Sequence, residues 1–133
     1  MKQLALALLL AGAPVSASLA NGAQGDARFY ASLKRLDPDT RMDQICDYEA
    51  MLRIDRDASP YHPDRAKAEV ISTPQRTRTS VKATGGAFRS HGRWYSLSFT
   101  CSTTPDHMKV TAFSYQIGKL IPESDWSKYG LWR

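Results

Sequence analysis

The stretch WYSLSFTCST, residues 94–103, decides the fold of this 133-residue chain. Within it, Tyr95, Leu97, Phe99 and Cys101 alternate with small hydroxyl-bearing residues. This alternation is typical of a strand with one buried face and one face toward water. The pattern therefore predicts a strand whose core face carries Cys101.

Three further stretches continue the period of two on either side of this segment. A loop with two prolines over residues 58–64 precedes them, and a polar, basic segment over residues 75–79 is predicted to be a loop or an exposed edge. The strand-forming stretches are residues 66–70, residues 81–90 with a bend at two glycines, and residues 108–116. The sequence therefore predicts an antiparallel sheet of about four strands.

Two helical stretches precede the strands. Apolar residues at i, i+4 and i+7 indicate a helix over residues 26–36. Pro38 suits the first position of a second helix, which is predicted to reach about Arg56. Cys46 lies on its predicted inner side. The residues that we place on its outer, solvent-facing side are Arg41, Asp47 and Arg53.

Helices followed by consecutive strands indicate the α+β class. We expect an N-terminal helical hairpin packed on one face of the sheet, and a short C-terminal helix that ends near Gly130. Cys46 and Cys101, both on inner faces, predict one disulfide between helix and strand. Such a bond closes a loop of roughly 55 residues, which corresponds to roughly 4 kcal/mol of stabilisation. The alternatives are two buried free thiols or half of a metal site, and the metal site is disfavoured because neither cysteine has a second one nearby.

The N-terminus has the three parts of a secretory signal. Lys2 supplies a positive start, an apolar stretch follows over residues 4–13, and small residues allow cleavage after Ala17 or, as we prefer, after Ala20. About ten residues rise only about 15 Å as a helix, against roughly 30 Å of hydrocarbon, so a membrane anchor is disfavoured. We expect a signal peptide over residues 1–20, a flexible linker over 21–28 and a single domain over 29–133. The predicted location is periplasmic or secreted.

Three blocks of the sequence resemble one bacterial family. The blocks are residues 36–51, residues 86–95 with Cys101, and residues 105–107 and 113–118 followed by Ile121, Pro122, Trp126 and Tyr129. In order and spacing they resemble the family called domain of unknown function 930, over about residues 29–131. The resemblance implies an envelope protein of the alphaproteobacterial kind, either secreted or tethered to the inner membrane. It implies no activity, cofactor or catalytic residue.

A cluster of basic residues provides the predicted binding site. The chain carries a net charge of +5, and removal of a signal whose one charge is Lys2 leaves +4. A positive excess favours anionic partners. The predicted binding residues are Arg76, Arg78, Arg89, Arg93 and Trp94. On the solvent face of neighbouring strands they would form a cationic strip with an aromatic edge. The alternative is a charged face that prevents aggregation between edges.

Neither a metal site, a cofactor site nor a catalytic site is predicted. His62, His91 and His107 lack the spacing of metal ligands, and the sequence has no nucleophile elbow and no glycine-rich phosphate loop. Asp106 and His107 are interpreted as an Asx-turn that leads into a strand. We expect a non-catalytic domain that binds an anionic envelope polymer or a periplasmic protein, with nucleic acid disfavoured. The alternatives are a structural docking module of the envelope and a small secreted hydrolase, such as a nuclease that uses Glu49, Arg89 and His107.

Overall fold

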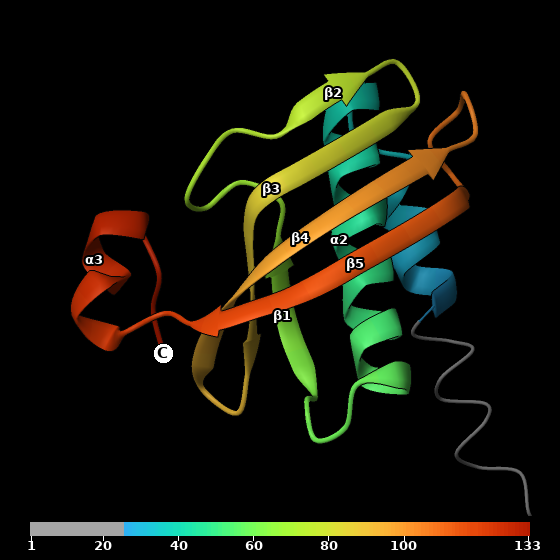
Figure 1. Cartoon of the computed structure of the whole chain (residues 1–133). Coiled ribbons are helices and arrows are strands. Elements are labelled where there is room, and N and C mark those ends of the chain that lie inside the picture. Colours follow the sequence, from blue (N-terminus) through green and yellow to red (C-terminus); the bar gives the residue numbers. More distant parts are fainter. Residues whose placement is uncertain (1–25) are drawn as a thin grey trace, which may run out of the picture.

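A long helix, α2 (Pro38–Asp57), lies across one face of an antiparallel sheet in the computed structural model, which describes residues 26–133 (Figure 1). The carboxylate of Asp37 accepts a hydrogen bond from the backbone N–H of Thr40 at 3.0 Å, so Asp37 is the N-cap. Pro38 follows at a position where a helix needs no N–H donor. The predicted start of this helix at Pro38 is therefore confirmed, and its end at Asp57 lies one residue beyond the predicted Arg56.

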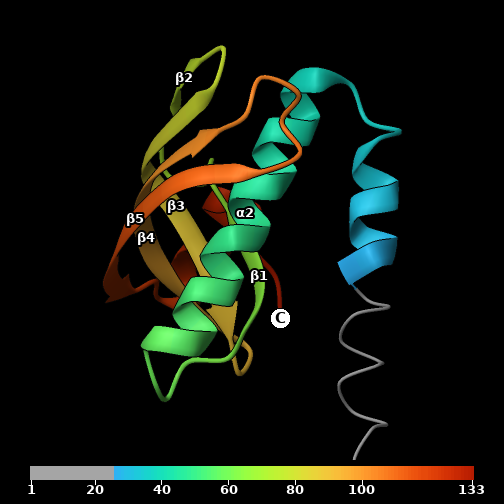
Figure 2. The same cartoon turned by 90° about the vertical axis from the view of Figure 1, so that its right-hand side faces the viewer.

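Residues 26–33 form a helix beside α2 (Figure 2). Arg41 of α2 holds the C-terminal end of that helix, where backbone carbonyls lack partners within the helix. Its guanidinium donates to the carbonyl oxygens of Leu33 and Leu36, both at 2.9 Å, and of Asp106 at 3.0 Å. The placement of Arg41 on the solvent side is therefore wrong. This first helix ends at residue 33, before the predicted residue 36, and the predicted helical hairpin on one face of the sheet is not confirmed.

The proposed signal peptide and its cleavage site at Ala20 lie outside the described residues, as does the linker up to residue 25. Residues 26–28, which the predicted linker and the predicted first helix both include, are helical. No helix among residues 26–133 is both long enough and apolar enough to cross a bilayer.

The sheet contains five strands, one more than predicted. They are β1 (Pro63–Lys67), β2 (Gln75–Thr77), β3 (Ser80–Ser90), β4 (Arg93–Thr103) and β5 (Val110–Leu120). The order is β1-β3-β4-β5, every pair is antiparallel, and β2 pairs with the start of β3. The additional strand, β2, is the segment that we left open between a loop and an edge. The first strand starts at Pro63, inside the predicted loop, because its residues pair with β3 as far as Ser90.

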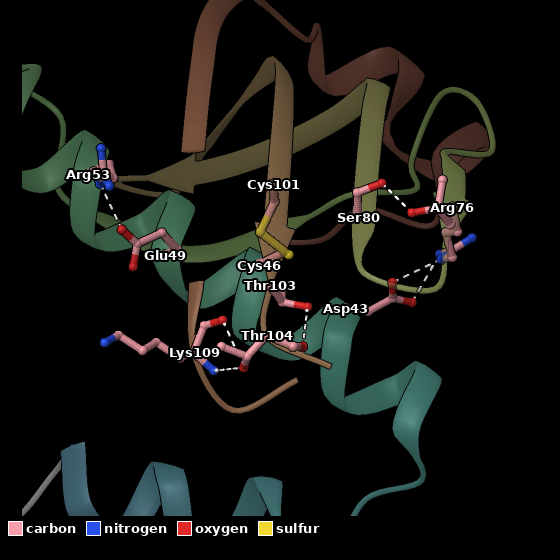
Figure 3. Close-up of a disulfide and its surroundings, with 11 residues drawn as sticks. Asp43, Cys46, Glu49, Arg53, Arg76, Ser80, Cys101, Thr103, Thr104 and Lys109 are labelled. Atoms are coloured by element: carbon pink, nitrogen blue, oxygen red, sulfur yellow. Dashed lines mark hydrogen bonds and ion pairs between the residues drawn. A yellow bond between two sulfur atoms is a disulfide. The ribbon is translucent and has the colours of Figure 1, made fainter. Parts of the chain in front are cut away.

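The main core lies between α2 and the sheet. Central strand β4 alternates as predicted, with Leu97, Phe99 and Cys101 buried. Cys46 of α2 and Cys101 of β4 form a disulfide with a Cα–Cα distance of 5.9 Å, and neither residue is exposed (Figure 3). The predicted covalent link between helix and sheet is therefore confirmed.

A second, smaller core involves the C-terminal segment. It consists of Ala87, Trp94, Ile121, Trp126 and Leu131. The short helix predicted here is present as a 3-10 turn, η1 (Glu123–Asp125), that runs into α3 (Trp126–Tyr129). Gly130 ends it at φ 66°, a left-handed conformation that favours glycine. The indole N–H of Trp94 donates to the carbonyl oxygen of Trp132 at 2.7 Å, which fastens the chain end to the sheet.

Candidate functional site

A cleft of about 440 Å³ lies between helix α2 and the edge strand β1. Six consecutive residues, 64–69, line it on the strand side. On the helix side it is lined by Thr40, Asp43, Gln44, Asp47, Tyr48 and Met51. This spacing of three and four residues is one face of a helix, so the cleft is a groove with a helix along one wall and a strand along the other.

Small side chains on the strand side leave room for this groove. Ala66 and Ala68 are buried in the main core that α2 also forms, and both line the groove. A larger side chain at either position would fill the space in front of α2. Phe29 of the first helix also lines the groove, and its ring lies 4.0 Å from the ring of Tyr48.

Asp47 is the unusual residue of the groove. Its Oδ1 atom is buried and has no hydrogen-bond partner among the described residues. Burial, and then the like charge of Asp43, raise the pKa of this carboxyl well above its ordinary value. A backbone hydrogen bond from Ala68 and the cations Lys67 and Arg76 act in the opposite direction and do not cancel the effect. An unpartnered buried polar atom costs free energy, and folded proteins rarely contain one without a reason.

The other acidic residues that line the groove are engaged with arginines. Asp43 accepts two hydrogen bonds from Arg76 of β2, both at 2.9 Å, and Glu69 lies 3.7 Å from the same guanidinium (Figure 3). Asp64 accepts two from Arg89, both at 2.8 Å, and this pairing lowers the pKa of Asp64. Asp47 is therefore the one lining acid that no described side chain neutralises by direct contact.

The basic residues predicted to form a binding strip fall into two groups. Arg76 and Arg78 lie at the β2–β3 hairpin, whereas Arg89, Arg93 and Trp94 lie at the opposite end of β3, where Arg89 pairs with Trp94 in the ladder. Arg76 pairs with Val81 of β3, and Arg89 lies eight residues further along the same strand, which corresponds to about 25 Å. A continuous strip therefore does not form.

Most members of these two groups already have partners. Arg89 is bound to Asp64, and its guanidinium lies over the rings of Trp94 and Trp132 at 5.8 and 5.7 Å. Trp94 is fully buried. Arg93 is exposed and lines a separate pocket of about 460 Å³ together with Trp126. Binding of an anionic partner by these residues stays a prediction.

The residues considered for a nuclease are not joined into one site. Glu49 accepts a hydrogen bond from Arg53 at 2.7 Å, Arg89 is held by Asp64, and His107 is buried. No hydrogen bond or ion pair in the described part of the chain connects any two of Glu49, Arg89 and His107. Among residues 26–133, no group of three or more histidine, cysteine or acidic side chains is suited to hold a metal ion.

His107 connects three segments of the backbone. Its Nδ1 lies 2.5 Å from the carbonyl oxygen of Pro38, and its Nε2 lies 2.7 Å from that of Arg78. Carbonyl oxygens only accept, so the ring is the donor in these contacts. The predicted Asx-turn is confirmed, since Asp106 Oδ1 accepts from the backbone N–H of Met108 at 3.1 Å. His107 lies in this turn, at φ 59°, and does not begin the next strand.

Sequence reasoning did not single out Asp47 as a binding residue because it assigned this residue to the solvent side of α2. That assignment assumed one buried face, toward the sheet. The helix is covered on a second side by β1 and by the helix of residues 26–33, and Asp47 faces this side. One signal was present: Asp43 and Asp47 stand at i and i+4, a like-charge pair that destabilises a helix without compensation.

These features define a small α+β domain in which a disulfide fastens a helix to a five-stranded antiparallel sheet and a groove separates that helix from the sheet edge. The chain belongs to the family described as Domain of Unknown Function (DUF930), which matches residues 33–131. The matched range contains α2, all five strands and both cysteines. No curated protein and no solved structure matches the chain.

Proposed function

We propose that the protein is an exported, non-catalytic binding domain whose ligand occupies the groove between α2 and β1. The observation that carries this proposal is the buried, unpartnered Oδ1 of Asp47, a residue that lines a cleft of about 440 Å³. Clefts of about 300–1,000 Å³ with a few polar groups are typical ligand sites. A ligand that donates a hydrogen bond to the Asp47 carboxyl offsets the cost of burying it.

The chemistry of the groove suits recognition. The remaining acids of the lining are bound to Arg76 and Arg89, so one carboxyl is left for a ligand. Acid–base catalysis on a bound substrate commonly uses a second titratable group within reach. The histidine considered for that role, His107, has both ring nitrogens directed at backbone carbonyls.

Asp47→Asn tests whether the carboxyl is retained at a cost to stability. We expect the variant to be more stable at neutral pH, by on the order of 1–3 kcal/mol, because an amide carries no charge to desolvate. The pKa of Asp47 is raised in the folded state. The contribution of this carboxyl to the free energy of unfolding of the wild type is therefore fully present below about pH 4, and it is lost as the pH rises toward the raised pKa. The difference in urea-unfolding free energy should therefore be near zero at pH 4 and grow toward pH 7.

Binding is tested with the same pair of proteins, by nuclear magnetic resonance titration with soluble peptidoglycan fragments, spermidine and a pool of short basic peptides. We expect at least one probe to shift the amides that line the groove in the wild type and to shift them much less in Asp47→Asn. Asp55→Asn, on the exposed side of α2, is the matched control. The proposal is overturned if no probe shifts these amides, or if the two proteins respond equally.

Export is tested by expressing the full chain in a Gram-negative host and measuring the intact mass of the accumulated protein. We expect cleavage after Ala20, so that the mature protein begins at Asn21. A charged residue in place of Ala20 should block this cut or move it to Ala17. An intact protein that begins at Met1 and stays in the cytoplasm would contradict export.

A further inference from the structure

We infer that the ligand of the groove is an extended peptide segment that pairs with the free edge of β1 and presents a lysine or arginine side chain to Asp47. This inference rests on the proposed function of the groove. It combines three features: an unpaired strand edge, two walls of equal length, and one uncompensated acid between them.

The first feature is the edge of β1. This strand ends the sheet order, and among residues 26–133 it pairs only with β3 (Figure 2). Its other side therefore presents backbone N–H and C=O groups without strand partners. An extended peptide satisfies such groups by adding a strand, which is a common mode of peptide recognition.

The second feature is the shape of the groove. Six consecutive residues of the strand side, 64–69, extend for about 16 Å. The helix wall, from Thr40 to Met51, also extends for about 16 Å. Two parallel walls of this length hold about five residues of extended chain. A compact ligand would contact only part of this lining.

The third feature is charge. In the lining, Asp43 and Asp64 are each held by two hydrogen bonds from an arginine, whereas Asp47 Oδ1 has no partner. A lysine or arginine side chain that alternates toward α2 brings a positive charge and donors to this carboxyl. Such a contact favours the ionised form of the Asp47 carboxyl. Binding should therefore weaken as the pH falls and this carboxyl becomes protonated.

The lining of the groove also favours a long, narrow side chain at the ligand position that faces Asp47. Ala66 and Ala68 line the groove with small apolar side chains, against which the stem of such a side chain can lie. Tyr48 and Met51 provide apolar surface beside it on the helix wall. The chain that lies in the groove therefore needs one cationic residue, flanked by residues that tolerate a strand conformation.

A positional-scanning library of peptides of about seven residues tests the inference, since that length covers the groove. With the secreted protein and fluorescence anisotropy, we expect selection for lysine or arginine at one position. Asp47→Asn should lose this selection and bind the best peptide at least about tenfold more weakly. Asp55→Asn should bind like the wild type.

N-methylation of the best peptide separates strand pairing from simple charge attraction. Successive amides of a strand point to opposite sides, so methylation of one alternate set should abolish binding and methylation of the other should not. Amide hydrogen exchange at residues 64–68 should slow in the complex. Equal effects of both methylation patterns, or resonance shifts centred on β5 in place of β1, would overturn the inference.

The same experiments keep this inference separate from the proposed function. If no library peptide binds, while spermidine or peptidoglycan fragments shift the groove in a manner that depends on Asp47, the peptide inference is wrong and the proposed binding function stands. If no probe depends on Asp47, both are wrong.

Discussion

Replacement of Cys46 and Cys101 together by alanine is expected to lower the free energy of unfolding by about 4 kcal/mol. The two residues are 55 positions apart, so the bond restricts a large part of the unfolded chain. Both are fully buried, so truncation also removes packing between α2 and β4. A domain of this size has a total stability of about 5–15 kcal/mol, and the variant retains a fraction of it.

Urea unfolding of the double variant and of the oxidised wild type, followed by circular dichroism, measures this loss. Reduction of the wild type by dithiothreitol is a second route to the same comparison that keeps both side chains. Met42→Leu in the same core conserves volume and serves as a control that costs less than about 1.5 kcal/mol. A loss below about 1 kcal/mol by both routes would show that other contacts hold α2 on the sheet.

His107→Asn is expected to destabilise the domain by about 2–4 kcal/mol. The carbonyl oxygens of Pro38 and Arg78 lose their side-chain donor, and each lost hydrogen bond costs about 0.5–1.5 kcal/mol. The buried ring also loses its packing, which adds roughly 1 kcal/mol. Asparagine tolerates the left-handed backbone at φ 59°, so the variant isolates the loss of the ring. His107→Ala should cost somewhat more, because alanine adds backbone strain at this position.

His62→Gln is the matched control, because His62 lies on the surface beside Asp55 and should cost less than about 0.5 kcal/mol. A stability of His107→Asn equal to that of the control would contradict the role of His107 as a connector between backbone segments.

Elements with strong local signals were predicted well. Pro38 predicted the start of α2, and strict alternation predicted β4, because each signal reflects a preference of the chain at that point. The strand β1 was predicted with shifted bounds, residues 66–70 in place of Pro63–Lys67, and β2 was left open between a loop and an exposed edge. Their sequences, PDRAK and QRT, carry no alternating apolar pattern, and they are strands because β3 offers them backbone partners.

The candidate site was harder to predict for a related reason. Nearness in sequence suggested that Arg76 and Arg89 share a surface, yet an eleven-residue strand carries them to opposite ends of the sheet. Asp47 was overlooked because its environment depends on β1, whose position no local pattern reveals. Both errors concern which segments meet in space, whereas the disulfide was predicted because both cysteines lie in strongly patterned elements.

The position of the disulfide has a consequence for the kinetics of recognition. Cys46 directly precedes Asp47, so the covalent bond fixes the helix at the level of the proposed contact residue. Because α2 is fixed in this way, little rearrangement has to accompany binding. The association rate constant should therefore be high and similar for related ligands. Discrimination among ligands should then appear in their residence times, and reduction of the bond should shorten those times even where the domain stays folded.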